Sequence, residues 1–439
     1  MQILFRGILW FGLYVTLALL PIAVVLLADD HAAPRSFAVE FGVAIGLIAF
    51  AVMTFEFALV GRLREASRPF GIDALMQFHR QMGVVACLLL LVHVGAVLFG
   101  AMTWAAFNPF SGTSSGRAGA IALWALVVLA TTSLGRKRLR LRYETWQRLH
   151  AFAALLIVMA SLQHMLAVNH YLASAALRGL LLGYVALFFL LLLRYRVFRA
   201  MRLSRRPWRV VGNRDEGGDT RTLVLESSGH EGLRFEPGQF VWLSTARSPW
   251  SMEQHPVSIA SSAEKSTTLE LSIKALGDWS RDVVPRIEVG RSVWVDGSYG
   301  AFTPDRLPAQ GLVLIAGGVG ITPMRSILLT MRDREDVRPV TLIYAAHSPE
   351  RMVFVSELLA LQQSIHLKCV FVYEAPPPDW TGERGFVTTE LLQRHLPPHA
   401  EHFEYLVCGP APMMNAVERS LLSLGLSGER ICTERFDMD

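Results

Sequence analysis

The chain has 439 residues, of which 52% are hydrophobic and 18% are charged, with a net charge of +5. This composition is too apolar for an ordinary soluble protein, and the length suggests roughly two to four domains. The four cysteines form no C-x-x-C pair and match neither a zinc site nor a plant-type iron–sulfur cluster, which excludes a fused ferredoxin domain. Three of them lie in the less apolar half, which we place in a reducing compartment, so we expect no disulfides.

Long apolar segments dominate the first part of the chain. A helix needs about 20 apolar residues to cross the hydrocarbon core of a bilayer. Six segments have approximately this length: residues 8–27, 38–60, 75–100, 118–133, 146–168 and 175–193. The first resembles a signal peptide, but its apolar run exceeds the usual ~7–15 residues and no A-x-A cleavage site follows. We therefore expect a retained helix and a six-helix transmembrane bundle in the lipid bilayer.

Basic side chains gather in alternate connections between these segments. They are Arg62, Arg64, Arg68, Arg136, Lys137, Arg138, Arg140, Arg142, Arg194, Arg196, Arg199, Arg202, Arg205 and Arg206. The opposite connections hold little beyond Arg35, Arg117 and Arg178, with Asp29 and Asp30. Since basic residues favour the cytoplasmic side, we expect an integral protein of the cytoplasmic (inner) membrane with both termini in the cytoplasm. This topology explains the basic clusters, and nothing indicates nucleic-acid binding.

Four histidines lie within the third and fifth apolar segments. His79 and His93 are 14 positions apart, as are His150 and His164. Fourteen helical steps fall about 40° short of four full turns, so each pair shares one helix face at a separation of about 21 Å. Both helices run in the same direction, so His79 should meet His150 near the cytoplasmic side, and His93 should meet His164 near the other. Imidazole is an axial ligand of haem iron, and the pattern predicts two stacked haem sites.

Three alternative roles for these histidines stay open. They could be hydrogen-bonded core residues, a ladder that transports metal ions, or part of a di-iron site. Ionisable residues within membrane helices are costly and usually functional, and two identical spacings favour ligands over accidental core positions. A di-iron site is less favoured, because Glu56 is the only intramembrane carboxylate near the middle of a helix.

The residues around the histidines add a family resemblance. F-H-R-Q-M-G at residues 78–83 and Y-E-T-W-Q-R-L-H at residues 143–150 resemble the haem-ligand segments of ferric-reductase-like transmembrane proteins. This superfamily includes NADPH oxidases and ferric reductases. The resemblance implies two haems b, with His79, His93, His150 and His164 as the iron ligands.

From residue 208 to about residue 304 the pattern changes to short alternating strands with Gly and Pro turns. The expected strands are residues 210–211, 222–225, 240–243, 269–273 and 293–295. Many short strands of this kind indicate a small antiparallel β-barrel.

H-P-V-S at residues 255–258 lies within this region. A proline turn before a strand would account for it equally well, but it also resembles the flavin-binding strand of the ferredoxin-NADP reductase family. K-A-L-G-D-W-S at residues 274–280 and D-G-S-Y-G at residues 296–300 resemble that family's helix start and closing turn. Backbone amides at a helix start suit a diphosphate. The resemblance implies FAD binding by His255, Pro256, Val257, Ser258, Lys274, Gly277, Asp278, Trp279 and Ser280. In it His255 contacts the diphosphate region, Val257 lies against the flavin and Ser258 bonds near its reactive nitrogen.

From Gly311 strands alternate with helices, which predicts an α/β nucleotide-binding domain. A buried strand at residues 312–316 leads into a glycine turn and a helix, a combination that binds pyrophosphate. The spacing is not G-x-G-x-x-G; it is similar to the G-G-x-G-x-T-P of the reductase family, and an ordinary tight turn is the alternative. The implied nucleotide-binding residues are Gly317, Gly318, Gly320, Thr322 and Pro323.

The end of the chain carries further family-like residues. Y-L-V-C-G-P at residues 405–410 ends in the family's Cys-Gly-Pro, which implies Cys408 beside the nicotinamide, followed by Gly409, Pro410 and Met413. Cys408 could instead be a buried structural thiol. Phe436 resembles the C-terminal aromatic that stacks on the flavin, although three residues follow it. The resemblance thus gives Ser258, Cys408 and Phe436 catalytic roles.

The preference between NADPH and NADH should depend on residues after the second strand of this domain. His347, Ser348 and Arg351 could contact a 2′-phosphate, which favours NADPH, with NADH as the alternative. Arg351 could equally be an ordinary solvated charge at a helix start.

Together these segments predict three domains: a transmembrane di-haem domain over residues 1–205, an FAD-binding barrel over residues 206–306 and an NAD(P)H-binding domain over residues 307–439. Electrons would pass from NAD(P)H through FAD and two haems to a small acceptor, because flavin converts hydride transfer into single-electron steps. Dioxygen, giving superoxide as in NADPH oxidases, is the favoured acceptor; a ferric or cupric chelate, or an envelope protein, is the alternative. No obligate protein partner is evident.

One family feature is missing from the outer site. NADPH oxidases place a further histidine and an arginine beside the outer haem, whereas Val97 stands four positions after His93. His31, Arg35 and His170 could replace them or could be solvated loop residues. A different class also stays open, a haem-free, membrane-anchored flavin reductase that serves a soluble carrier.

Overall fold

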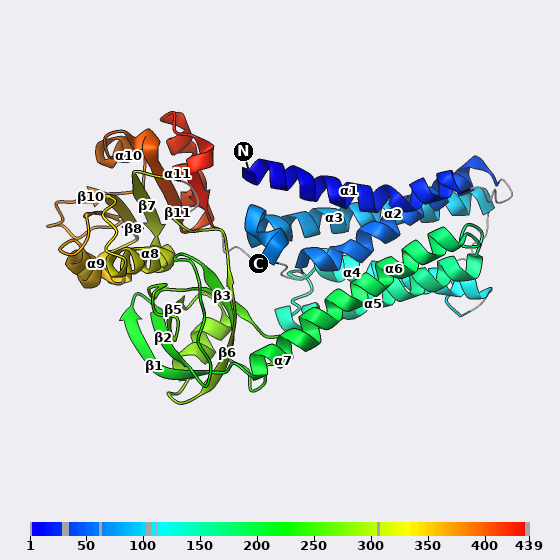
Figure 1. Cartoon of the computed structure of the whole chain (residues 1–439), viewed down its shortest axis with the longest axis horizontal. Helices are drawn as coiled ribbons and strands as arrows, with labels where there is room; N and C mark the ends of the chain where they lie inside the picture. Colours follow the sequence, from blue (N-terminus) through cyan, green and yellow to red (C-terminus); the bar gives the residue numbers. More distant parts are fainter. Residues whose placement is uncertain are drawn as a thin grey trace. The chain divides into compact units, whose positions relative to one another are not determined.

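The computed structural model describes residues 2–28, 35–60, 64–101, 107–110, 112–304 and 308–434. The chain separates into two compact units, one made of nearly all residues up to Arg199 and one that begins at Ala200 (Figure 1). We call them the helical unit and the sheet unit. The predicted positions His31, Asp29, Asp30, Arg62 and Phe436 lie outside the described residues.

The helical unit consists of long apolar helices. They are α1 (Gln2–Leu27), α2 (Phe37–Val60), α3 (Arg64–Ala101), α4 (Ser114–Leu134), α5 (Tyr143–Val168) and α6 (Ala175–Leu193). All six are long and apolar enough to cross a membrane, which confirms the predicted six helices. The last of them continues through a π-helical turn (Arg194–Phe198) into the short helix α7 (Arg199–Ser204).

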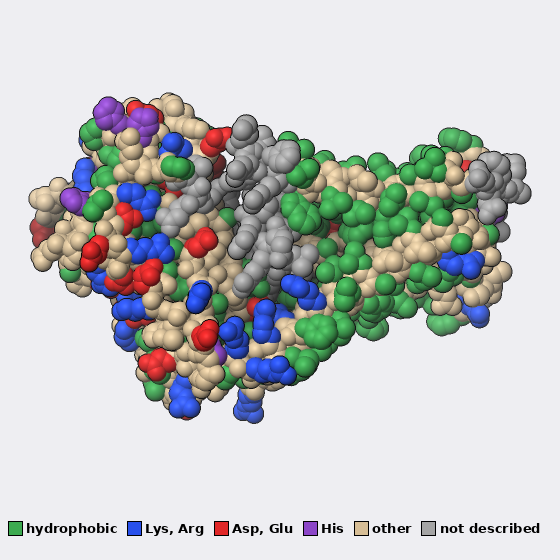
Figure 2. Space-filling model, in the orientation of Figure 1, with side chains coloured by type: hydrophobic (Ala, Val, Ile, Leu, Met, Phe, Trp, Pro, Cys, Tyr) green, Lys and Arg blue, Asp and Glu red, His purple; other side chains and the backbone are tan. Residues whose placement is uncertain are grey.

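The surface of the helical unit is mainly apolar. Hydrophobic side chains cover the face seen in Figure 2, where charged side chains are few. Leu88, Leu91 and Phe152 are each more than half exposed. A soluble protein would bury such side chains, so this surface matches a lipid environment. The interior of the unit is formed by residues such as Leu177 and Leu181 of α6, both fully buried.

The first half of the sheet unit is an antiparallel barrel. Its strands are β1 (Trp208–Gly217), β2 (Thr220–Ser227), β3 (Phe240–Ser244), β4 (His255–Ser258), β5 (Thr268–Lys274) and β6 (Ser292–Tyr299). They pair in the order β4-β3-β6-β1-β2-β5, and a bridge between Ile259 and Leu271 joins the two ends. Alternate side chains such as Val210, Leu225 and Leu243 fill the interior without exposure. The predicted antiparallel barrel is confirmed.

The second half is a parallel sheet covered by helices, as predicted. Its strands are β7 (Gly311–Gly317), β8 (Val340–Ala346), β9 (Leu367–Tyr373), β10 (Glu383–Arg384), β11 (Phe403–Cys408) and β12 (Ile431–Thr433). The helices are α8 (Ile321–Asp333), α9 (Val355–Leu361), α10 (Thr389–His395) and α11 (Ala411–Ser423). The strand order is β10-β9-β8-β7-β11-β12, so the chain moves outward from β7 on one side and then continues on the other. This reversal between β7 and β11 is where open α/β sheets bind ligands.

Candidate functional site

The four histidines of the helical unit form two facing pairs between α3 and α5. The ring centroids of His79 and His150 are 6.2 Å apart with an interplanar angle of 70°. Those of His93 and His164 are 6.4 Å apart with an angle of 80°. We call His79 and His150 the inner pair, because they lie towards the end where α5 begins and α6 ends.

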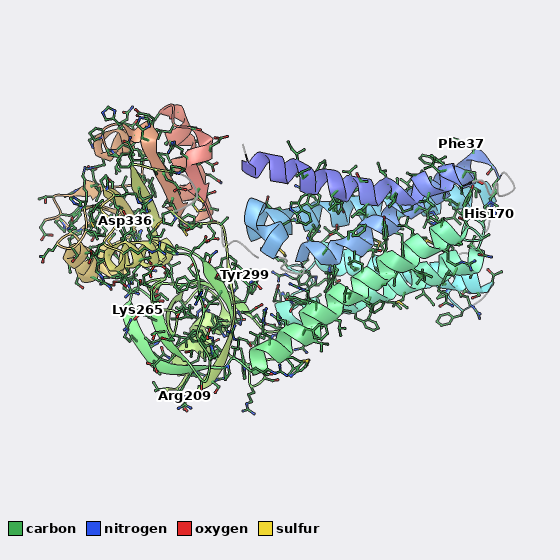
Figure 3. The ribbon with its side chains drawn as sticks, in the orientation of Figure 1. Phe37, His170, Arg209, Lys265, Tyr299 and Asp336 are labelled. Atoms are coloured by element: carbon green, nitrogen blue, oxygen red, sulfur yellow. The ribbon has the colours of Figure 1, made fainter. Side chains whose placement is uncertain are left out.

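We call His93 and His164 the outer pair. They lie towards the opposite end of the bundle, where α2 begins and α5 ends. In Figure 3 that end is marked by Phe37 at the start of α2 and by His170 just after α5.

The separation within each pair fits a metal ion held from two sides. A metal–nitrogen bond of about 2 Å and about 1.1 Å from nitrogen to ring centre place two opposed rings about 6.2 Å apart. Both observed separations, 6.2 and 6.4 Å, agree with this value. Among the described residues no three metal-ligating side chains converge on one point. Two nitrogens are too few for a bare ion, so the pairs suit a group that brings its own equatorial ligands, as haem does.

Backbone carbonyl groups orient both rings of the outer pair. Nδ1 of His93 lies 2.8 Å from the carbonyl oxygen of Gly42, and Nδ1 of His164 lies 2.8 Å from that of Ser115. A carbonyl can only accept, so both Nδ1 atoms carry the proton. Each Nε2 is then left unprotonated and available to a metal.

Two glycines make room for the outer rings, and sequence reasoning missed them. A Cβ atom at Gly46 would lie 2.7 Å from Nδ1 of His93, and one at Gly119 would lie 3.0 Å from Nδ1 of His164. At Gly42 a Cβ atom would lie 3.1 Å from the Cβ atom of Ala96. The signal that could have found the first site is the G-x-x-x-G of Gly42 and Gly46, which allows close helix approach in membranes.

Side chains, not the backbone, contact the rings of the inner pair. Nδ1 of His150 lies 3.1 Å from the hydroxyl of Ser133, which also accepts a 3.4 Å bond from the indole of Trp146. Nδ1 of His79 contacts a carboxylate oxygen of Glu56 on α2. The hydroxyl of Tyr14 on α1 reaches the other carboxylate oxygen at 3.5 Å. The two pairs therefore share ring geometry and differ in what surrounds it.

The outer end of the bundle holds two of the three predicted substitute residues. The ring of His170 packs edge-on against Tyr171 at 4.8 Å, and its Nε2 is buried without a hydrogen-bond partner among the described residues. Tyr171 donates to Glu40 of α2. The structure places Arg35 just before α2, with its side chain half-buried.

In the barrel, His255 and Trp279 form a stacked pair. Their ring centroids are 3.8 Å apart at an interplanar angle of 11°, and the Trp279 indole donates a 2.9 Å bond to the hydroxyl of Thr245. Burial lowers the pKa of His255 to about 4, so the ring is neutral at pH 7.

The predicted helix start at residues 274–280 is a short π-helical segment, η3 (Trp279–Val283). Its Ser280 hydroxyl accepts bonds from the backbone amides of Leu276 at 3.0 Å and Gly277 at 2.9 Å. These amides, expected to face a diphosphate, thus have a partner within the chain. The sequence placed Gly277, Asp278 and Ser280 in one turn but did not show this internal bond.

Other predicted flavin contacts lie at the ends of strands. Val257 and Ser258 are buried at the end of β4, where Ser258 pairs with Phe240 of β3. The hydroxyls of Ser244 and Thr322 are also buried and have no hydrogen-bond partner in the described part of the chain. Buried hydroxyls normally have partners, so unpaired ones suit a polar ligand.

The glycine turn after β7 packs tightly against the turn after β11. A Cβ atom at Gly320 would lie 2.2 Å from the carbonyl oxygen of Cys408, and one at Gly317 would lie 2.5 Å from the sulfur of Met413. Gly318 has a φ of +54°, which favours glycine, and the Lys274 ammonium lies 3.8 Å from its ideal Cβ position. The strand pairing aligns Cys408 with Ala316, so the structure brings these two predicted segments together.

Around the predicted 2′-phosphate contacts the structure places carboxylates. Nδ1 of His347 lies 3.1 Å from Glu374, the Ser348 hydroxyl donates a 2.6 Å bond to Glu350, and the Arg351 guanidinium lies 3.4 Å from Asp219. Each residue expected to hold an added phosphate therefore already faces a negative charge.

Arg325, two positions after the end of the glycine motif, was not predicted as a site residue. Its side chain is 7% exposed and bonds Glu270 of β5 and Glu357 of α9, each at 2.6 Å. It also donates a 3.1 Å bond to the carbonyl of Ala260. Burial alone would raise the pKa of Glu270, but the charges of Arg325 and Arg214 hold this pKa below its usual value. The network joins the barrel to the parallel sheet.

Three family models match the chain in order. They are described as a ferric reductase like transmembrane component over residues 45–161, an FAD-binding domain over residues 218–302 and an oxidoreductase NAD-binding domain over residues 314–419.

Curated relatives match about a third of the chain. NADH-cytochrome b5 reductase 1 of Debaryomyces hansenii is 37% identical over 161 residues, which are 36% of this chain and 56% of that protein. The protein of the same name from Aspergillus terreus is 35% identical over 153 residues, which are 33% of this chain and 51% of that protein. The chain thus spans about half the length of these relatives.

Similar solved structures also cover about half of this chain. The FAD/NAD-binding domain of a Vibrio cholerae nitric oxide dioxygenase has 27% identity and a TM-score of 0.46, covering 53% of this chain and 98% of that one. An Amycolatopsis cytochrome P450 reductase has 26% identity and a TM-score of 0.46, covering 53% and 69%.

Proposed function

Since the chain is an integral membrane oxidoreductase in which a ferric reductase like component precedes FAD- and NAD-binding domains, we propose that it moves electrons across a membrane. The electrons come from a nicotinamide nucleotide and pass through FAD, a haem at the inner pair and a haem at the outer pair to an acceptor. The basic connections support the cytoplasmic membrane, with both termini and the sheet unit in the cytoplasm.

The observation that carries this proposal is the equal geometry of the two histidine pairs. Ring separations of 6.2 and 6.4 Å fit axial ligands on either side of an iron. Every one of the four Nδ1 atoms already has a contact in the chain, so the Nε2 atoms are the free ligand atoms. Four core histidines without a metal would have no need of this shared arrangement.

FAD, when bound, accepts a hydride and passes electrons on singly. The chain's contribution is to position the two cofactors at the ends of β4, β7 and β11. We assign Ser258 to the flavin and Cys408 to the nicotinamide as contact residues, with Phe436 as the aromatic that covers the flavin. Gly317, Gly320 and Gly409 let the turns after β7 and β11 pack closely together, and we assign the glycine turn after β7 to the nucleotide's pyrophosphate.

We assign NADH, and not NADPH, as the preferred donor. Glu374, Glu350 and Asp219 stand beside the residues that would contact a 2′-phosphate. An acidic residue at this strand end suits the free 2′-hydroxyl of NADH. Two curated relatives are named NADH-cytochrome b5 reductase 1, which supports this assignment.

Each histidine pair would hold its haem from both sides, which would leave no open position for an acceptor at the metal. Dioxygen is the acceptor we propose: one NADH and two dioxygen molecules would give NAD⁺, one proton and two superoxide ions. A ferric chelate is the second candidate, because the matched transmembrane model is described as ferric reductase like.

Reduced-minus-oxidised absorption spectra of the purified, haem-supplied protein test the cofactor assignment. We expect the sharp bands of low-spin b-type haem together with flavin bleaching on addition of NADH. A flavin spectrum without haem bands would reject the proposal and support the haem-free flavin reductase.

Reduction of cytochrome c by NADH, with and without superoxide dismutase, tests the acceptor. Suppression by dismutase supports superoxide formation. Reduction that dismutase leaves unchanged rejects dioxygen as the acceptor. Ferric citrate, assayed anaerobically, then tests the second candidate.

A further inference from the structure

Glu56 is a carboxylate in the middle of the helical unit and is not one of the four proposed haem ligands. It lies on α2, 12% exposed, and contacts Nδ1 of His79 on α3. Among the described residues, His79 is the one proposed ligand whose Nδ1 contacts a carboxylate. The Nδ1 atoms of the other three histidines contact neutral groups. This inference rests on the proposed function, because it concerns the haem at the inner pair.

The four Nδ1 partners differ in charge and in origin. The outer rings donate to the carbonyls of Gly42 and Ser115, and His150 faces the hydroxyl of Ser133. His79 alone of the four faces a carboxylate within the described structure. The two proposed iron sites therefore have the same kind of ligand. They differ in the group that contacts Nδ1 of His79.

A carboxylate at Nδ1 has a defined effect on an iron-bound imidazole. It draws on the Nδ1 proton, makes the ring a more basic ligand and so favours the ferric state over the ferrous state. The surrounding apolar helices reduce solvent screening of this interaction. Carbonyl and hydroxyl partners act in the same direction, but more weakly because they carry no full charge.

The carboxylate is also held in place from a third helix. The Tyr14 hydroxyl of α1 reaches the second oxygen of Glu56 at 3.5 Å. The Tyr14 ring packs edge-on against Phe78, the neighbour of His79, at 5.2 Å. Helices α1, α2 and α3 thus fix one oxygen of Glu56 towards the histidine.

We propose that Glu56 is a positioning residue that orients His79 and lowers the reduction potential of the inner haem below that of the outer haem. Transfer of one electron from the inner to the outer site then runs downhill. Electrons that have crossed the bundle are disfavoured from returning towards the flavin.

Potentiometric titration of the full-length, haem-loaded protein tests this proposal. The wild type should show two b-type components with different midpoint potentials. Glu56→Gln keeps the size of the side chain and removes its charge. The equilibrium constant for reducing the inner haem should then increase at least tenfold, which raises the lower midpoint potential by about 59 mV for one electron. Glu56→Asp, which keeps the charge, should return it towards the wild-type value.

Thr54→Val is the matched control. Thr54 lies on the same helix, and its hydroxyl donates a 2.8 Å bond to the carbonyl of Phe50 and not to a histidine. Both midpoints should stay unchanged in this variant, with haem content equal to that of the wild type.

The outcomes separate this proposal from the proposed function. A wild type without haem rejects the function itself. Two haems with an unchanged lower midpoint in Glu56→Gln, a shift of the higher midpoint instead, or equal shifts in the Gln and Asp variants would overturn the role of Glu56.

If Glu56→Gln fails to hold the inner haem, Tyr14→Phe serves as the second variant. Loss of the tyrosine bond leaves the carboxylate a stronger acceptor for His79, so the lower midpoint should fall. A rise, or no change, would overturn the proposal.

Discussion

The helical unit and the sheet unit use polar side chains in opposite ways. Acidic and basic side chains are scattered over the sheet unit and sparse over the helical unit (Figure 2). In the helical unit, Glu56, Tyr14 and Ser133 lie at or beside the histidine pairs. A polar group inside a membrane is costly, so its position there indicates function. In the sheet unit an ion pair is common, and its presence alone indicates little.

The sharpest test of this contrast removes a proposed haem ligand from the helical unit. His93→Ala should abolish reduction of the external acceptor while reduction of the flavin by NADH continues at the wild-type rate. Stopped-flow absorbance at the flavin and haem bands measures both steps. His170→Ala is the control, since its ring faces Tyr171, and it should retain both haems. Loss of flavin reduction in His93→Ala would contradict the idea that flavin reduction in the sheet unit is independent of the histidines in the helical unit.

The next effect concerns the buried ion network of the sheet unit. Arg325→Met leaves Glu270 and Glu357 without their shared partner, and should destabilise the sheet unit by about 3 kcal/mol, the low end for a buried pair because Glu357 is 34% exposed. Urea unfolding followed by flavin fluorescence measures this loss. Arg334→Met, which breaks the exposed pair with Glu264, should cost under about 1 kcal/mol.

The pH dependence of this stability has a defined sign. The folded-state pKa of Glu270 is lowered, so the contribution of the network is present above the carboxyl's unfolded pKa and is lost as pH falls through the folded value. The difference in free energy of unfolding between the wild type and Arg325→Met should shrink on acidification below about pH 4, the ordinary pKa range of a glutamate. An advantage that grows with acidification would contradict this assignment.

A smaller effect should follow from closing the space beside His93. Gly46→Ala places a methyl group 2.7 Å from Nδ1 of His93, and should weaken haem binding at the outer pair by about tenfold, as changes beside a metal ligand often do. Gly95→Ala, where a Cβ atom meets nothing within 4 Å, is the control. Haem content after dilution, measured from the pyridine haemochrome, should fall only in the first variant.

The smallest expected effect lies at the exposed nucleotide contacts. Glu374→Gln removes a surface charge near a 2′-phosphate, and should improve the kcat/KM ratio of NADPH to NADH by about threefold, within the range of exposed charge pairs. Glu401→Gln, an exposed carboxylate in the same domain, should leave the ratio unchanged. A ratio that falls in Glu374→Gln would reject the assignment of NADH preference.

The periodicity of the sequence predicted much of the helical unit but few of the residues that contact its four histidines. Fourteen-residue spacing placed His79 opposite His150, because helix geometry alone fixes which ligands share a face. The contact between Glu56 and His79 was not predicted. Helix α2 is apolar on all sides, so its sequence does not show which residue faces α3. Gly46 and Gly119 were missed for the same reason.

In the sheet unit, motifs predicted the segments but not their long-range contacts. The glycine turn after β7 and the Cys-Gly-Pro turn after β11 were predicted as separate nucleotide contacts, and their close packing was not predicted. Arg325 was not predicted as a site residue, because its partner Glu270 is 55 positions away. The bonds of Ser280 to the amides of Leu276 and Gly277 depend on a π-helical turn that the residue pattern did not indicate.

The helix α2 supplies no ligand, yet it contacts both histidines of α3. Gly42 and Gly46 meet His93, and Glu56 contacts His79, with the carbonyl and the carboxylate 14 positions apart, as the histidines are. Helix α2 therefore carries a readable sequence signature, G-x₃-G-x₉-E, on the segment before the first H-x₁₃-H. Genome searches that require both signatures would separate chains that combine the histidines with the proposed positioning carboxylate from chains that carry the histidines alone.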